Sequence, residues 1–154
     1  MFLRRLGVPE PDVEDVLQEV VLVTANRLGD IASGAERSFL YSTAYRVAAK
    51  WRRRVGRHHE VYDDAVDAVD PRPRPDQALE EREALRLLNE VLEEMPLDLR
   101  AVFVLYEIEE HTMGEIAELL ELATGTTASR LRRARALFEE KIVRLRARQP
   151  DGVT

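Results

Sequence analysis

Cysteine is absent from this 154-residue sequence, and so are several other features that mark familiar classes of protein. Without cysteine, the chain can form no disulfide framework, no thiolate metal site and no cysteine nucleophile. No apolar run approaches the roughly 20 residues of a membrane-spanning helix. The first residues are interrupted by Pro9 and Pro11 too early for a signal peptide. We therefore predict a soluble cytoplasmic protein without membrane insertion.

Motifs for catalysis are also lacking. The sequence contains no phosphate-binding loop, no nucleophile elbow and no glycine-rich dinucleotide fingerprint. Its three histidines are His58, His59 and His111, and the adjacent pair lacks a metal partner at ligand spacing. Neighbouring acids such as Glu93 and Glu94 are most simply explained as a solvated helix face. We predict that the protein is not an enzyme and uses no metal or other cofactor.

The net charge of the chain is −6, but its charged residues are distributed unevenly along the sequence. Residues 46–57 carry six basic groups and no acidic one, and residues 122–154 carry eight basic groups and three acidic ones. The segment 60–121 between them holds nineteen acidic groups and five basic ones. Two positive stripes on an acidic body indicate binding to nucleic-acid phosphates, although the mean charge alone would argue against it.

Apolar residues recur at helical spacing along most of the chain, which predicts an all-α fold. In the segment that follows Asp12, its length and acidic start favour a helix over the strand that its valines would otherwise suggest. Trp51 is assigned to the core in preference to base stacking, and Thr112 and Glu115 have the spacing of a capping box. The predicted helices span residues 12–28, 36–54, 76–95, 98–108, 112–120 and 124–148.

An acidic, proline-containing segment divides these helices into two small helical domains. Residues 58–78 include five aspartates and the alternating prolines Pro71, Pro73 and Pro75. Proline at every second position is incompatible with a helix and favours an extended spacer. We predict domains at residues 1–57 and 79–148, joined by a flexible linker at residues 58–78, with Asp76 as the cap of the next helix.

The last two predicted helices have the layout of a helix-turn-helix motif, with residues 121–123 as the turn. In that motif the start of the second helix meets base edges in the major groove. Small residues there permit close approach, and the arginines that follow can reach phosphates or guanine edges. The alternative is a solvated helical hairpin with one basic face. The candidate contacts are Thr126, Thr127, Ala128, Ser129, Arg130, Arg132, Arg133 and Arg135.

The same region resembles the promoter-reading region 4 of extracytoplasmic-function (ECF) sigma factors. The resemblance rests on Glu115–Leu120, which matches an EIA-x-x-L helix, and on Thr124–Arg135, which is similar to G-T-V-x-S-R-L-x-R-A-R. Residues 95–103 are similar to the family's L-P-x-x-x-R-x-V-F segment. Thr127 stands where valine is usual, and Ala128 where a basic residue is frequent. The resemblance implies that the eight residues above contact the −35 promoter element, with Arg130 and Arg135 nearer the DNA backbone.

The first half resembles region 2 of the same family. Residues 12–20 are similar to A-E-D-x-x-Q-E-V-F, which implies that Asp15, Gln18 and Glu19 bind the clamp helices of the largest polymerase subunit. Residues 38–44 and the basic end that follows resemble the segment that grips the melted −10 element, although Phe39 replaces tryptophan and Arg46 replaces asparagine. The implied −10 contacts are Arg37, Phe39, Arg46, Lys50, Arg53 and Arg54.

Together these features imply a transcription initiation factor that binds RNA polymerase core, through the clamp helices and the flap, and directs it to promoter DNA. The family has a longer helix before the Asp12 segment, and here only residues 1–8 precede it. Two alternatives therefore stay open: a polymerase- or partner-binding module without promoter specificity, and a simple helix-turn-helix regulator. The resemblance also implies a partner of the anti-sigma type.

Overall fold

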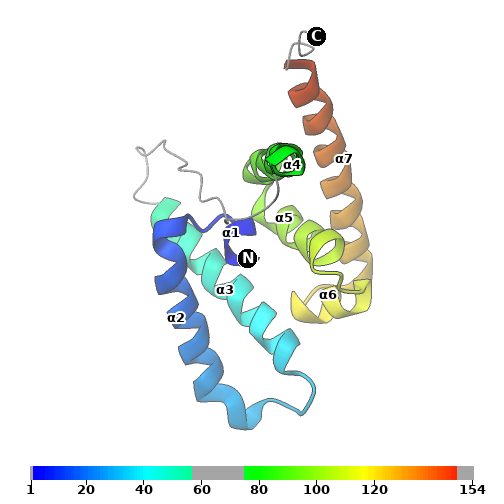
Figure 1. Cartoon of the computed structure of the whole chain (residues 1–154). Coiled ribbons are helices and arrows are strands. Elements are labelled where there is room, and N and C mark those ends of the chain that lie inside the picture. Colours follow the sequence, from blue (N-terminus) through cyan, green and yellow to red (C-terminus); the bar gives the residue numbers. More distant parts are fainter. Residues whose placement is uncertain (1, 57–74, 149–154) are drawn as a thin grey trace.

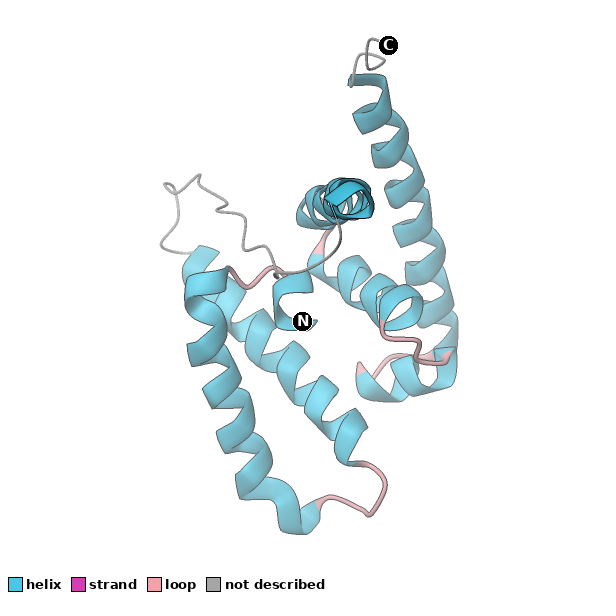
Figure 2. Ribbon diagram, in the orientation of Figure 1, coloured by secondary structure: helices cyan, strands magenta, loops and turns pink. Residues whose placement is uncertain are grey.

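The structure is a computed structural model of the chain, and it describes residues 2–56 and 75–148. In these residues every regular element is a helix, as Figure 2 shows. The chain runs through α1 (Phe2–Arg5), α2 (Glu10–Arg27), the 3-10 turn η1 (Leu28–Asp30), α3 (Glu36–Gly56), α4 (Pro75–Glu93), α5 (Leu97–Phe103), the π-helical turn η2 (Val104–Ile108), α6 (Met113–Leu119) and α7 (Thr124–Arg148). The predicted all-α fold is confirmed.

Helices α2 and α3 form an antiparallel pair, and α4 to α7 form a second group beside it (Figure 1). The short α1 lies between the two groups. Hereafter residues 2–56 are called the first half and residues 75–148 the second half. Within the described residues, no helix is long and apolar enough to cross a membrane.

Proline sets the start of α2. Pro9 has an extended backbone (ψ 153°) and occupies the N-cap position, while Pro11 lies in the first turn, where no backbone donor is needed. The helix therefore begins at Glu10, two residues before the predicted start. Asp12 lies inside the first turn, where its charge still favours the positive end of the helix dipole.

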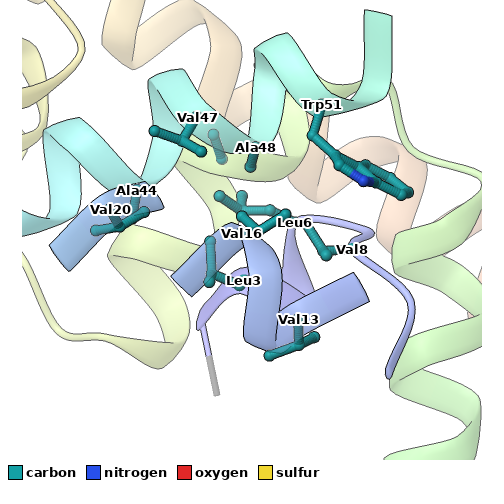
Figure 3. Packing of buried hydrophobic residues seen from close by; sticks show 11 residues of the cluster. Leu3, Leu6, Val8, Val13, Val16, Val20, Ala44, Val47, Ala48 and Trp51 are labelled. Atoms are coloured by element: carbon teal, nitrogen blue, oxygen red, sulfur yellow. The ribbon is translucent and has the colours of Figure 1, made fainter. Parts of the chain in front are cut away.

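The core of the first half lies between α2 and α3, with residues from α1 and the turn after it filling the space between them (Figure 3). Val16 and Val20 of α2 face Ala44 and Ala48 of α3. These alanines allow the two helices to approach closely. Trp51 is 8% exposed and belongs to this core, as predicted.

Helix α4 begins at Pro75, so the last residues of the predicted linker, 75–78, are helical rather than extended. Proline is well tolerated at the first helical position because its missing N–H would have no partner there. Asp76 consequently lies within the helix and is not its cap. The rest of the predicted linker, including Pro71 and Pro73, falls outside the described residues.

The fourth predicted helix is present but has a different start and a changed end. Pro96 and not Asp98 occupies the N-cap position of α5. After Phe103 the chain widens into η2, in which the Glu109 amide donates to the Val104 carbonyl at 3.0 Å. The left-handed backbone of Glu110 (φ 58°) then ends the helix.

Helix α6 begins with the predicted capping box. The Glu115 amide donates to the Thr112 hydroxyl at 3.2 Å, and the Thr112 amide donates to the Glu115 carboxylate at 2.7 Å. These hydrogen bonds lower the pKa of Glu115. The turn after α6 includes Glu121 in the left-handed region (φ 55°), and α7 begins at Thr124 as predicted.

The residues of α5 from Leu99 to Phe103 are all buried. Its Phe103 stacks on Phe138 of α7 with ring centroids 5.0 Å apart. Its Ala101 belongs to the apolar cluster of the first half, so the cores of the two halves touch. This central helix therefore fixes the position of α7 and also contacts the core between α2 and α3.

We expect Leu105→Ala to lower the free energy of unfolding by about 2–5 kcal/mol, because Leu105 is completely buried and its truncation leaves a cavity. Leu79→Ala is the control, because Leu79 is 71% exposed and its truncation should change stability by about 0.5 kcal/mol or less. Urea denaturation followed by circular dichroism measures both. Equal losses in the two variants would contradict the placement of Leu105 in the core.

Candidate nucleic-acid interface

The helix-turn-helix presents the start of α7 to solvent. Thr126 and Ala128 are exposed, and nothing lies within 4 Å of a Cβ atom placed on Gly125. Arg132 and Arg133 are exposed one turn later, and neither forms an ion pair with a described residue. An anionic ligand could therefore approach this surface without displacing a carboxylate from either guanidinium.

Thr127 is the exception among the predicted −35 contacts. It is completely buried, and its hydroxyl donates to the Ala123 carbonyl at 3.1 Å. This position points into the packing between α6 and α7, which explains why the related pattern has valine there. The prediction that Thr127 contacts DNA is therefore corrected: the side chain shapes the turn and is not accessible to a base.

Two of the remaining predicted −35 residues, Arg130 and Arg135, contact acids from other elements of the second half. Ser129 and Arg130 are half-buried, and Arg130 Nε lies 3.7 Å from an Asp98 carboxylate oxygen. Arg135 Nε donates to Glu107 at 2.5 Å, which raises the Arg135 pKa, and its guanidinium lies 5.1 Å from the Tyr106 ring centroid. Arg130 and Arg135 thus flank the exposed Arg132 and Arg133.

A second basic surface runs along α3. Arg46, Lys50, Arg53 and Arg54 are exposed. Arg37 is exposed as well, and its guanidinium lies over the Tyr41 ring, 5.6 Å from its centroid. Two of these cations are paired with acids. Lys50 Nζ donates to Glu19 of α2 at 2.8 Å, and Arg46 pairs with Glu121 of the helix-turn-helix turn.

Phe39 lies at a cavity of about 270 Å³ between α2 and α3. Apolar side chains form much of its lining, and three cations surround them. A flat apolar group attached to a negative charge would suit this combination of apolar and cationic side chains. Sequence reasoning found Phe39, Arg46 and Lys50 but missed the α2 contribution, because only antiparallel packing brings the two helices together. The lining residues are Val23, Arg27, Phe39, Thr43, Arg46, Val47 and Lys50.

The outer face of α2 combines polar and apolar groups. Asp15 and Gln18 are exposed, as the prediction of a polymerase contact requires, but Glu19 is half-buried beside Lys50. Val21 and Leu22 are 52% and 63% exposed on the following turn. Exposed apolar groups next to polar ones are typical of protein-binding surfaces.

A polar cluster joins the two halves near the start of α6. The Tyr41 hydroxyl donates to Glu109 at 2.7 Å, and Arg5 donates to the other oxygen of the same carboxylate at 3.0 Å. Burial and this hydrogen bond raise the Tyr41 pKa. The His111 ring packs edge-on against Tyr41 with centroids 4.8 Å apart.

His111 is 6% exposed, and its Nε2 atom has no hydrogen-bond partner among the described residues. Burial lowers its pKa and the charge of Arg37 lowers it further, whereas Glu115 and Glu109 act in the opposite direction. In the described part of the chain, no group of three or more histidines, cysteines, aspartates or glutamates could hold a metal ion. His58 and His59 lie outside the described residues.

Comparison with known proteins supports the resemblance. Residues 85–138 match the family model for sigma-70 region 4. The chain is 28% identical over 145 residues to the ECF RNA polymerase sigma-E factor of Escherichia coli K12, which covers 88% of this chain and 76% of that protein. It is 33% identical over 140 residues to a Xanthomonas campestris protein named "Probable RNA polymerase sigma factor RfaY", covering 84% of this chain and 34% of that one.

The fold is similar to that of the sigma factor RpoE from Bartonella quintana, solved in complex with the anti-sigma factor NepR. The TM-score is 0.70 at 21% sequence identity, and the match covers 92% of this chain and 87% of that chain. At this identity the likeness concerns the fold alone. It extends over both halves of the chain.

We expect the protein to lose stability as the pH falls below about 6.5, the ordinary pKa of histidine. The folded-state pKa of His111 is below that value, so the unfolded chain binds the proton more readily. The loss continues until the pH reaches the folded-state pKa. Urea denaturation between pH 7.5 and 5.5 measures it, with His111→Phe as the variant that retains a buried ring but cannot titrate. The same pH slope in both chains would show that His111 is not responsible.

Proposed function

The chain belongs to the sigma-70 family of transcription initiation factors, in its ECF group, and is not an enzyme; on that premise we propose that it binds RNA polymerase core and directs it to specific promoters. The observation that carries this proposal is the pair Arg132 and Arg133, which are exposed in the third turn of α7 and have no ion-pair partner among the described residues. They offer guanidinium groups at the position where a helix-turn-helix meets base edges.

Contacts to the −35 element come, in this proposal, from the exposed face of α7. Thr126, Ala128 and Ser129 allow the helix to enter the major groove closely, and Arg132 and Arg133 reach guanine edges. A bidentate arginine–guanine contact discriminates against a wrong base by about 1–3 kcal/mol. Arg130 and Arg135, which are held by Asp98 and Glu107, lie nearer the DNA backbone.

Contacts to the −10 element come from α3. Single-stranded DNA is bound by a positively charged groove with aromatic side chains on which bases stack. Arg46, Lys50, Arg53 and Arg54 supply the charge, with Arg37 near the start of the helix. The cavity at Phe39 suits an unstacked base, since its lining includes the apolar Val23 and Val47. The cations Arg27 and Lys50 of the same lining can meet the flanking phosphates.

Polymerase core binds, in this proposal, to the outer face of α2, with the clamp helices of the largest subunit against Asp15 and Gln18. Val21 and Leu22 extend that surface and would be buried in the complex. Glu19 contributes less directly, because it is paired with Lys50 and orients that side chain. The second half would meet the polymerase flap.

We also propose an anti-sigma partner. The structure of similar fold contains such a partner, and exposed apolar side chains on α2 give this chain a surface that a protein could cover. The same surface is the one proposed for the clamp helices, so a partner bound there would exclude polymerase.

Run-off transcription with purified core tests the proposal. We expect Arg132→Ala/Arg133→Ala to reduce promoter-selective transcripts by about tenfold or more, because two base or phosphate contacts are lost. The control is Arg146→Ala/Arg148→Ala, which removes the same charge from the exposed last turn of the same helix. Core binding without transcripts from any promoter would favour the module that lacks promoter specificity, and no core binding would favour a simple regulator.

A binding titration with core tests the α2 surface separately. Asp15→Ala/Leu22→Ala should weaken core binding by about tenfold or more, since a buried apolar contact and a polar one are both removed. Glu140→Ala/Val143→Ala removes an acid and an exposed aliphatic side chain from α7 and should leave binding unchanged. Equal weakening by both pairs would place the polymerase contact elsewhere.

A further inference from the structure

The π-helical turn η2 joins α5 to α6, and α7 runs alongside both of these helices (Figure 1). Val104 at the start of the turn is completely buried and belongs to the same apolar cluster as Ala134 of α7. The side chains further along the turn are accessible, since Tyr106 is half-buried and Glu107 is exposed. Because π-helical turns are rare and often lie at functional sites, these two side chains are candidates for a functional role.

Tyr106 and Glu107 hold the guanidinium of Arg135 from two sides. Glu107 accepts from Arg135 Nε at 2.5 Å, and the guanidinium carbon lies 5.1 Å from the Tyr106 ring centroid. Ala134, the chain neighbour of Arg135, packs with Val104, so the backbone that carries Arg135 is fixed to the turn that carries Glu107. Arginine has many rotamers, and a guanidinium that is already oriented loses less entropy when it binds a ligand.

The contact with Glu107 leaves most donors of the guanidinium available. Glu107 accepts from the N–H of Nε, so the N–H groups of Nη1 and Nη2 can bind a second anion. Two parallel N–H groups match two oxygens of one phosphate. Because the Arg135 side chain is exposed, a phosphate can reach these groups while the contact with Glu107 remains.

Arg135 lies at one edge of the exposed face of α7. At about 100° per residue, Arg132 and Arg133 lie between Arg135 and Arg130 on that face. Arg130 is at the opposite edge, with its Nε 3.7 Å from Asp98 of α5. The major groove of B-DNA is about 12 Å wide, close to the diameter of a helix with its side chains, so the two edges of a helix in the groove face the two phosphate backbones.

We propose that Glu107 is a positioning residue for promoter recognition. It holds Arg135 in the orientation that binds one DNA phosphate, and this contact sets the register in which Arg132 and Arg133 meet base edges. Phosphate contacts fix the orientation of a protein on the duplex without reading sequence themselves. This inference rests on the proposed function, because it takes the −35 contact of α7 as its premise.

The charge of Glu107 and its positioning role affect DNA binding in opposite directions. A carboxylate repels phosphates, so its removal alone should strengthen binding to every DNA sequence to the same extent. Loss of the orientation of Arg135 should weaken only the binding that depends on register, which is the binding to a preferred sequence. The ratio of the affinities for preferred and unrelated DNA therefore separates the two effects.

Holoenzyme assembled from polymerase core and the full chain allows this ratio to be measured. Wild-type holoenzyme first selects its preferred sequence from a random duplex library. Competition titrations then compare that duplex with a scrambled duplex of the same composition. We expect Glu107→Ala to lower the ratio about tenfold, with binding to the scrambled duplex unchanged or tighter. Glu107→Gln keeps an oxygen that can accept from Arg135 Nε and should retain most of the ratio.

A double-mutant cycle shows whether Glu107 acts through Arg135. Arg135→Ala should lower the ratio by a similar factor, and the addition of Glu107→Ala should lower it no further. Glu140→Ala is the matched control, because it removes the same charge from a carboxylate that pairs with Arg144 in a later turn of α7. This control should leave the ratio unchanged. Circular dichroism confirms that each variant is folded.

An unchanged ratio in folded Glu107→Ala would overturn the positioning role, and so would a further loss in the double variant. Equal weakening on both duplexes would also overturn it, because it would indicate an effect on stability alone. If wild-type holoenzyme selects no sequence from the library, the proposed function fails, and this inference fails with it. Failure of the positioning role alone leaves the sequence preference of the wild type intact, so the two failures are distinguishable.

Discussion

The burial of α5 is the constraint on which the rest of the structure depends. Its residues face in every direction: Phe103 toward α7, Ala101 toward the first half, and Arg100 toward the end of α1. A helix that is apolar on nearly all sides must be enclosed, and here two separate groups of helices enclose it. The charged Arg100 is tolerated within it because backbone carbonyls of α1 replace the water that burial removes. The seven residues of α5 thus position both the helix-turn-helix and the end of α1.

Carboxylates limit which of the basic side chains can bind an anion without first giving up an ion pair. Lys50 and Arg46 each pair with an acid of a neighbouring element, whereas Arg132 and Arg133 have no such pair among the described residues. Each exposed pair costs about 1 kcal/mol or less to separate, so phosphates can compete for the paired cations. Arg132 and Arg133 need not release a carboxylate before they bind a phosphate. This difference explains how a chain of net charge −6 can present local surfaces suited to an anionic ligand.

Local patterns predicted the helices well, because helical spacing, the Thr112–Glu115 capping box and the three-residue turn before α7 act over a few neighbouring positions. The burial of Trp51 followed from the same spacing. Tertiary contacts could not be found in this way. Thr127 is buried because α6 packs on it, and the contact between Arg46 and Glu121 joins residues 75 positions apart. The packing of α1 between the two halves was missed for the same reason, since four residues carry too little periodicity to indicate what they pack against.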